Sequence, residues 1–160
     1  MTALTRIEMV VYLQAVDLFG HCTAEQMVRI ASIARQRRFA AGEAIYETND
    51  PAEALYCVVD GAVLLAGEGS SRKVLPPGTF GVEEILSDRL RSESARAEGE
   101  TIALVLDADD FFDLLSNNIE IVKALFRQLL QRRSTQETSA RSLTPPPGAK
   151  LDPTAARTSS

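Results

Sequence analysis

The pattern of apolar and polar residues changes twice along the chain. Before residue 35 the apolar residues recur every three or four positions, which is the period of an amphipathic helix. Residues 35–107 carry short apolar runs divided by turn-forming residues, a pattern typical of β-strands. The helical period returns over residues 108–133. The sequence therefore predicts helices, then strands, then helices again.

Two packing helices are expected in the helical lead-in, residues 5–34. Thr5 can cap the first, and Glu8 three residues later completes a capping box. Thr23 can cap the second. The expected apolar positions are Ile7, Val10, Val11, Ala15 and Leu18 in the first helix and Met27, Val28, Ile30, Ala31 and Ala34 in the second.

The strand-rich segment 35–107 predicts an antiparallel β-roll of the jelly-roll type. Its runs are too closely spaced for the helical crossovers that a parallel sheet needs. A short helix at 82–86, after Gly78 and Gly81, is expected to interrupt the strands. The predicted fold class is mainly β with flanking helices.

The C-terminal helices are expected over residues 108–133. Asp107 or Asp109 can cap the first of them and Asn117 the second. The second helix carries two adjacent apolar stripes, which are Ile121, Leu125 and Leu129, and Val122, Phe126 and Leu130. One stripe can cover the roll, and the other needs a partner. We assign Ile121, Leu125 and Leu129 to an interaction surface and expect a homodimer through this helix.

Residues 134–160 are rich in Ser, Thr and Pro and nearly lack large apolar side chains. Such a segment cannot offset its ordering entropy, so it is predicted to be a disordered tail. The domain plan is therefore one folded domain at 1–133 followed by the tail at 134–160.

Charge and composition narrow the classes of partner. A net charge of -5 opposes attraction to nucleic acid or to an anionic membrane surface. The cluster of Arg35, Arg37 and Arg38 fits a solvated strand edge better than an anionic partner. The chain lacks an apolar run of the roughly 18 to 20 residues that cross a bilayer, and its start does not resemble a secretion signal, so a cytoplasmic protein is expected.

The residues that carry enzyme chemistry are sparse. His21 is the only histidine, which excludes metal sites built from several imidazoles. Cys22 and Cys57 sit in apolar surroundings and are interpreted as inert core thiols. Asp107, Asp109 and Asp110 fit helix capping better than a cation site. We therefore expect no enzymatic activity, no metal and no cofactor.

One segment suggests an anion site. A Gly-Thr-Phe-Gly turn at 78–81 leads into the short helix and presents free backbone N–H groups. Arg91 follows ten residues after Gly81 as a candidate counter-charge. Taken alone, these residues equally fit an ordinary turn and a surface arginine.

An ordered series of segments makes the chain similar to a known family: LFGHCTAEQMVRIASIARQRRFAAGEAIYETNDPAEALYCVVDGAV, LPPGTFG, LRSESARA and IALVLDADDFFDLL. It resembles the cyclic nucleotide-binding domain of catabolite-activator-type regulators, protein kinase A regulatory subunits and gated channels, over about residues 13–133. The resemblance implies a β-roll with a phosphate cassette. The ligand-binding residues that it implies are Gly81, Val82, Glu83, Arg91 and Ser92, and the implied ligand is cAMP or cGMP.

The cassette departs from the family pattern, which is similar to FGE-x-AL followed by PR and small residues. Gly81 and Arg91 match, and the family's arginine pairs the cyclic phosphate. Val82 stands where the ribose-binding glutamate is expected and Glu84 where an alanine is expected; Leu90 replaces the proline and Glu93 a small residue. Glu93 is also a candidate partner for Arg91, two residues away on the same strand face.

These departures weaken the predicted binding. A lost hydrogen bond to the ribose costs about 1.5 to 3 kcal/mol. A carboxylate about 6 Å from the phosphate adds on the order of 2 to 3 kcal/mol. Each 1.4 kcal/mol is roughly tenfold in affinity, so a micromolar site would move toward millimolar.

We therefore predict a non-catalytic regulatory module with weak or lost nucleotide binding. It would act through protein–protein contacts with a partner or with its own parent polypeptide, because no helix-turn-helix, kinase or cyclase pattern follows the last helix. The alternative is a functional cAMP- or cGMP-binding domain, with Arg91 on the phosphate and Glu83 replacing the missing ribose acceptor.

Overall fold

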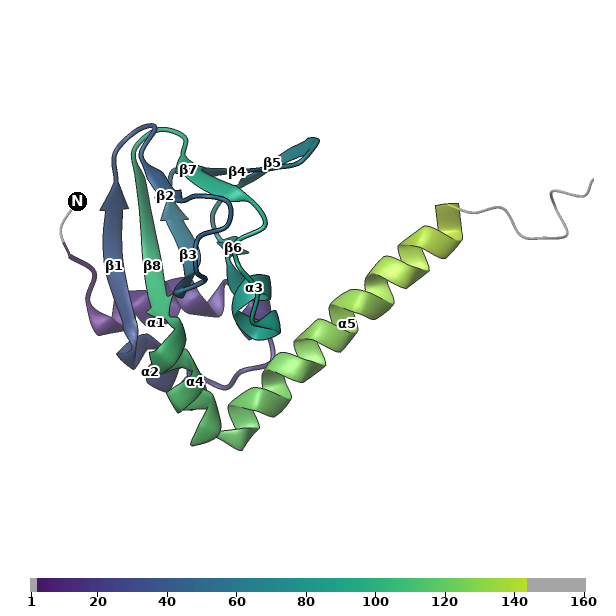
Figure 1. The fold of residues 1–160 in the computed structure, drawn as a ribbon. Helices are drawn as coiled ribbons and strands as arrows, with labels where there is room; N and C mark the ends of the chain where they lie inside the picture. The colour runs from purple at the N-terminus through teal and green to yellow at the C-terminus, as the bar shows by residue number, and fades with distance from the viewer. Residues whose placement is uncertain (1–2, 144–160) are drawn as a thin grey trace, which may run out of the picture. The chain divides into compact units, whose positions relative to one another are not determined.

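The structure is a computed structural model that describes residues 3–143, with side chains described as far as residue 134 (Figure 1). The helices are α1 (Arg6–Gln14), the 3₁₀ helix η1 (Asp17–Phe19), α2 (Ala24–Ser32), α3 (Val82–Ser87), α4 (Ala108–Ser116) and α5 (Ile119–Leu143). The strands are β1 (Ala34–Phe39), β2 (Ala44–Tyr46), β3 (Ala54–Asp60), β4 (Val63–Gly67), β5 (Ser70–Val74), β6 (Thr79–Phe80), β7 (Ser94–Ala97) and β8 (Thr101–Asp107).

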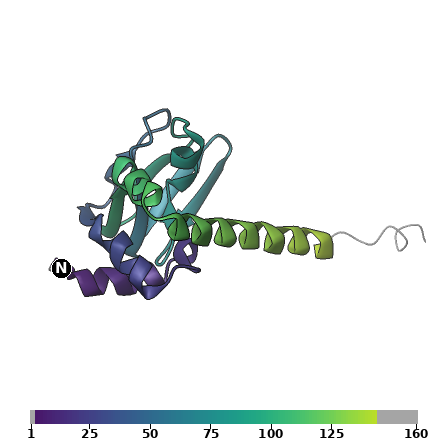
Figure 2. The same cartoon turned by 90° about the horizontal axis from the view of Figure 1, so that it is seen from below.

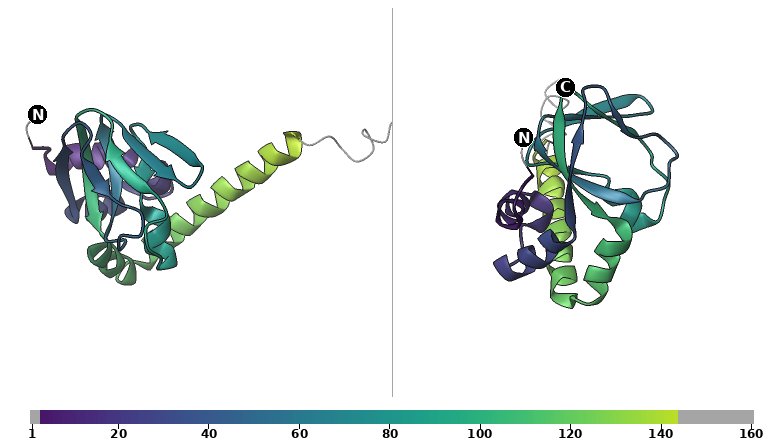
Figure 3. Two further views of the ribbon diagram at one scale, coloured as in Figure 1. Left: turned by 45° about the horizontal axis from the view of Figure 1, so that its top comes forward. Right: turned by 90° about the vertical axis from the view of Figure 1, so that its left-hand side faces the viewer.

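Two antiparallel four-stranded sheets form the β-roll, which confirms the predicted fold class. Their strand orders are β1-β8-β3-β6 and β2-β7-β4-β5. The two sheets face each other around a common interior (Figure 3). The sequence did not predict β6, because its two residues lie inside the turn 78–81 and are too few to show a strand period.

Side chains from both sheets fill the interior of the roll. Four aromatic residues meet there, and the rings of Tyr56 and Phe80 stack with their centroids 4.9 Å apart. Phe39 and Tyr46 complete the group, with the Tyr46 ring 6.1 Å from both Tyr56 and Phe80. Burying such large rings supplies much of the free energy that holds the two sheets together.

A second core lies between the helices and the outer face of β3 and β8. Along β8, Ile102, Leu104 and Leu106 belong to this core, whereas Ala103 and Val105 belong to the interior of the roll. This alternation follows from the two-residue period of a strand. Figure 2 looks from below and shows α4 in front of the strands, with α1 and α2 toward the lower edge of the view. Because both faces of β8 are covered, its sequence is a continuous apolar run.

The two lead-in helices begin where their capping residues predict. The Glu8 amide donates to Thr5 Oγ1 at 3.2 Å, and the Glu8 carboxylate accepts from the Thr5 amide at 2.7 Å. Thr23 and Gln26 form the same capping box at the start of α2. In α1, however, Ile7 is 77% exposed, so the expected apolar face of this helix is only partly buried.

The basic cluster lies on β1, an edge strand, and its side chains are engaged locally. Arg35 pairs with Asp107 at 2.9 Å and Arg38 with Glu100 at 2.9 Å, while the Arg37 guanidinium lies 4.6 Å from the centre of the Phe39 ring. Asp107 is the N-cap residue of α4 by position, but its carboxylate bonds to Arg35 rather than to the helix amides.

The last helix differs from the prediction in its end. Helix α5 continues at least to Leu143 instead of ending at Arg133, because residues 134–143 contain neither proline nor glycine. The rest of the expected tail, 144–160, lies outside the described residues.

The first turns of α5 also correct the predicted interaction surface. Ile121 is fully buried and Leu125 nearly so, both in the core beneath the roll, so they are not available to a partner; Leu129 is partly exposed. Phe126, on the other apolar stripe, is 61% exposed. The chain divides into two compact units after Gln128, and Leu129 begins the second.

Within residues 3–143, none of the helices combines the length and the apolar content that crossing a membrane requires.

Cys22 and Cys57 are free thiols; burial raises the pKa of Cys22 to about 11 and that of Cys57 to about 12.

Two glycines with left-handed backbone give a test of the roll's packing. Gly61 (φ +89°) lies so close to β8 that a Cβ would meet the Glu100 carbonyl at 2.5 Å, whereas at Gly99 (φ +82°) a Cβ would meet nothing within 4 Å. We expect Gly99→Ala to lower the free energy of unfolding by about 1 kcal/mol, the cost of the backbone conformation alone. Gly61→Ala should lower it by at least about 3 kcal/mol, because backbone must also move. Urea denaturation measures both, and equal losses would contradict this account.

Candidate functional site

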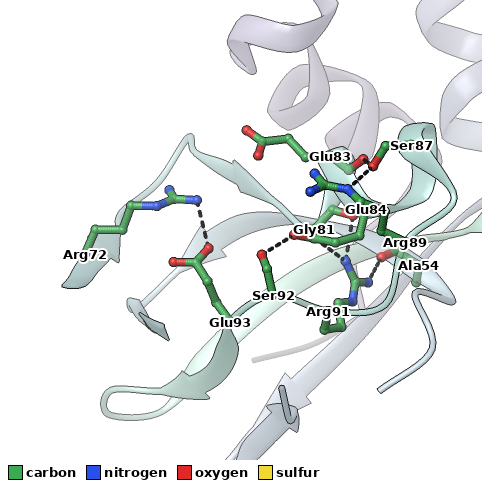
Figure 4. A network of polar contacts seen from close by, with 10 residues as sticks. All are labelled: Ala54, Arg72, Gly81, Glu83, Glu84, Ser87, Arg89, Arg91, Ser92 and Glu93. Carbon is green, nitrogen blue, oxygen red and sulfur yellow. Dashed lines mark hydrogen bonds and ion pairs between the residues drawn. The ribbon is translucent and has the colours of Figure 1, made fainter. Parts of the chain in front are cut away.

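The site is built around the left-handed turn that starts α3. Gly81, the N-cap residue of α3, has φ +84°. A Cβ at this position would lie 3.0 Å from Nη1 of Arg91 and 3.2 Å from the carbonyl oxygen of Ala54. Only glycine allows both this turn and the close approach of the guanidinium. Gly81 and Arg91 are thus brought together, as the sequence predicts (Figure 4).

The Arg91 guanidinium is buried, with 2% of the residue exposed, and it is surrounded by acceptors. Its Nη1 donates to the carbonyl oxygen of Gly81 at 2.8 Å and to Oε1 of Glu84 at 3.1 Å. Its Nη2 donates to the carbonyl oxygen of Ala54, and its Cζ lies 4.1 Å from the centre of the Tyr46 ring. Nε has no hydrogen-bond partner among the described residues. A cation removed from water in this way requires a neighbouring anion.

Glu84 supplies that anion from the first turn of α3. The residue is 7% exposed, and both carboxylate oxygens are bonded: Oε1 to Arg91 and Oε2 to Oγ of Ser92, which donates at 2.8 Å. Burial by itself would raise the pKa of Glu84, but the hydrogen bonds from Ser92 and Arg91 outweigh it and hold the pKa below its ordinary value. Arg91 and Glu84 therefore form a buried, charged pair at neutral pH.

The other two predicted ligand-binding residues stand apart from this network. Val82 is half-buried and packs against the core beneath the roll, and its apolar side chain has no hydrogen-bonding group. Glu83 is exposed, and its carboxylate points away from Arg91 (Figure 4). Of the five predicted ligand-binding residues, the structure brings together Gly81, Arg91 and Ser92.

The expected contact between Glu93 and Arg91 is wrong. Glu93 pairs instead with Arg72 of β5 at 3.5 Å, and Glu84 takes the place beside Arg91. Sequence reasoning noted Glu84 at a position where the family has alanine but did not predict its bonds to Arg91 and Ser92. The available signal was an acidic residue at a position that the family fills with alanine, in a helix only a few residues from an arginine and a serine.

A hollow of about 240 Å³ borders Arg91. It is lined by Ile45, Tyr46, Asp50, Pro51, Glu53, Tyr56 and Arg91. Burial raises the pKa of both tyrosines, and the nearby Arg91 cation opposes this, so both phenols stay protonated at neutral pH.

Comparison with known proteins places this geometry in a family. The sequence profile of the cyclic nucleotide-binding domain matches residues 36–118. A putative potassium channel protein of Rhodopseudomonas palustris is 30% identical over 123 residues, covering 74% of this chain and 30% of the relative. The cAMP-dependent protein kinase regulatory subunit of Dictyostelium discoideum is 28% identical over 109 residues, covering 62% of this chain and 33% of the relative. The chain thus spans about a third of the length of these relatives.

Solved structures agree on the fold. A putative cyclic nucleotide binding protein of Ruegeria pomeroyi superposes with a TM-score of 0.73 at 19% identity, covering 91% of this chain and 67% of that one. The catabolite activator protein of Thermus thermophilus gives a TM-score of 0.63 at 28% identity, covering 79% and 62%. The chain belongs to the cyclic nucleotide-binding domain family, whose β-roll is a non-catalytic regulatory module.

Proposed function

We propose that this chain is a regulatory module that acts through protein–protein contacts and in which cyclic-nucleotide binding is weak or lost. The observation that carries the proposal is the state of Arg91. Its charge is balanced by the buried carboxylate of Glu84, and its Nη atoms are bonded to Gly81, Ala54 and Glu84. The arginine that the family uses for phosphate is therefore already engaged within the protein.

The interaction energies favour the Arg91–Glu84 pair over a bound nucleotide. Separating a buried, hydrogen-bonded ion pair costs about 3 to 5 kcal/mol. A phosphate would recover part of this cost by bonding to Arg91 itself. The displaced Glu84 carboxylate stays on α3, and at about 6 Å from the phosphate it would add on the order of 2 to 3 kcal/mol of repulsion. The net change is unfavourable, which supports weak binding at best.

The site also lacks a hydrogen-bond acceptor for the ribose of a nucleotide. Val82 occupies the position of the family's glutamate and packs into the core. Glu83 is exposed and directed elsewhere (Figure 4). The missing acceptor costs a further 1.5 to 3 kcal/mol, roughly one to two powers of ten in affinity.

A functional cAMP- or cGMP-binding domain is the second candidate. It is favoured by the convergence of Gly81, Arg91 and Ser92 and by the hollow beside Arg91. Matching proteins include a cyclic nucleotide-gated potassium channel of Mesorhizobium japonicum and a regulatory domain of Toxoplasma gondii PKA with bound cAMP. In this chain such binding would require Glu84 to leave Arg91 and Ser92.

The surface through which the module acts is proposed on α5. The predicted homodimer through this helix is retained, but its contact moves from the buried Ile121 and Leu125 to the exposed stripe that includes Phe126. In a two-fold dimer the same patch faces itself, so one apolar stripe can cover its own copy. Because the match covers only about a third of the relatives, the alternative partner is the rest of a longer polypeptide that contains this domain.

Nucleotide titration tests the proposal directly. We expect no saturable heat by calorimetry when cAMP or cGMP is added to the wild-type chain up to about 1 mM, a limit that corresponds to roughly 4 kcal/mol of binding free energy. An Arg91→Lys variant, which keeps the charge but not the planar fork, is the matched control. Saturable wild-type binding that disappears in Arg91→Lys would replace the proposal with the second candidate.

The engaged pair also predicts how stability responds to acid. The pKa of Glu84 is lowered in the folded protein, so its contribution to stability is present above the pKa of an unfolded glutamate, about 4.3, and is lost as the pH falls through the lowered value. The wild type should therefore exceed Glu84→Gln in free energy of unfolding by a constant amount between about pH 5 and 7, and by less below about pH 4. Urea denaturation across this range measures the difference. A difference that does not change with pH would show that Glu84 is not ionised in the fold.

The dimer contact is tested at Phe126. Size-exclusion chromatography with light scattering should find wild type as a dimer at tens of micromolar and Phe126→Asp as a folded monomer, whose melting temperature, unlike that of wild type, does not depend on protein concentration. Ile7→Asp is the control, since Ile7 is even more exposed than Phe126 but lies on α1. A monomeric wild type would remove the homodimer from the proposal.

A further inference from the structure

We propose that the carboxylate of Glu84 is a tethered ligand: it fills the anion site formed by Arg91 and Ser92, and removing it exposes a binding site for a small oxyanion. This inference deepens the proposed function and rests on it. It assigns to Glu84 a positive role in the fold, beyond keeping a nucleotide away.

The contacts of the carboxylate are those of a bound oxyanion. Two different donors approach its two oxygens, Nη1 of Arg91 at 3.1 Å and Oγ of Ser92 at 2.8 Å. Ordinary surface pairs in this chain are different, since Arg38 and Glu100, for example, leave more than half of each side chain exposed. In the Arg91–Glu84 pair the two side chains are 1% and 8% exposed.

The carboxylate also closes a network that crosses several elements. Arg91 bonds to Ala54 in β3 and to Gly81 before α3, and Glu84 joins this group from within α3 (Figure 4). Helix α3 has only six residues, too few to be stable by its own hydrogen bonds. Its attachment to the roll therefore depends on such contacts. The anion that secures α3 is supplied by the helix itself, so α3 stays attached without any ligand from solution.

Loss of the carboxylate leaves a defined vacancy. Without it, the buried guanidinium keeps its hydrogen bonds to the carbonyl oxygens of Gly81 and Ala54 but has no counter-charge. The hydroxyl of Ser92 loses its hydrogen-bond acceptor. A buried cation in this state is destabilising. The chemical fragment missing after Glu84→Ala is close to acetate, and inorganic phosphate offers the same pair of oxygens with more charge.

The experiment is chemical rescue of the Glu84→Ala variant, followed by its melting temperature. Wild type and variant are compared in sodium chloride, sodium acetate and sodium phosphate at equal ionic strength, so that general screening is the same. In chloride, Glu84→Ala should melt on the order of 10 °C below wild type. Acetate or phosphate should raise its melting temperature by several degrees and in a saturable way, because the anion binds only the folded state.

Glu100→Ala is the matched control, because it removes the same charge from the exposed pair with Arg38. It should melt within about 2 °C of wild type and respond to the three salts as wild type does. A Glu84→Ala protein that melts as high as this control, or that gains no more from acetate and phosphate than the control gains, would overturn the proposal.

Glu84→Gln is a second variant that keeps the proposal testable if Glu84→Ala does not fold. The amide keeps the shape of the side chain and can accept a hydrogen bond, so this variant should fold, melt below wild type and show no specific gain from acetate or phosphate, whose place it fills. A gain equal to that of Glu84→Ala would indicate a general salt effect and overturn the proposal. If Glu84→Ala is insoluble in chloride, soluble protein should appear on refolding in acetate or phosphate, and its absence there would equally overturn the tethered ligand.

The two proposals fail separately. Nucleotide binding by the wild type, with rescue of Glu84→Ala intact, would remove the proposed function and leave a ligand that exchanges with nucleotide. Absence of rescue, with no nucleotide binding by the wild type, would remove only the tethered ligand.

Discussion

A positive charge enclosed by the protein must have a negative charge beside it, and in this chain that requirement is met at Arg91. The guanidinium lies beneath the turn at Gly81, against the Tyr46 ring, where water cannot solvate it. Glu84 meets the requirement from within the protein, and Ser92 orients its second oxygen. Arg91 bonds to the Gly81 turn and to Ala54 of β3, and Glu84 ties α3 to Arg91. This one pair thus connects the parts of the site, and the site depends on it.

The sequence predicted most of the fold because its local signals agree with its tertiary packing. Thr5 and Thr23 start their helices with capping boxes, and the alternating apolar runs become strands. Prediction failed where the signal was short or depended on tertiary contacts. The two residues of β6 are too few to show a period, and the two stripes of α5 are equally apolar, so only the packed structure decides that Ile121 and Leu125 lie inside.

The site was predictable as a set of positions but not as a set of bonds. Gly81, Arg91 and Ser92 follow from the resemblance to the family, and Val82 and Glu84 stand out as departures from it. Which carboxylate reaches Arg91 depends on side-chain direction: Glu84 projects from α3 toward the guanidinium, whereas Glu93, the residue before β7, pairs with Arg72. Charge and spacing along the chain do not distinguish these two directions.

The apolar strands β3 and β8 separate the aromatic interior of the roll from the helical core, and both of their faces are dry. These two strands contribute side chains to both cores. If either core comes apart, apolar side chains of β3 and β8 become exposed to water. Because the roll and the helices packed on it bury apolar residues of the same two strands, loss of either exposes apolar surface of the other, which favours unfolding of the two together.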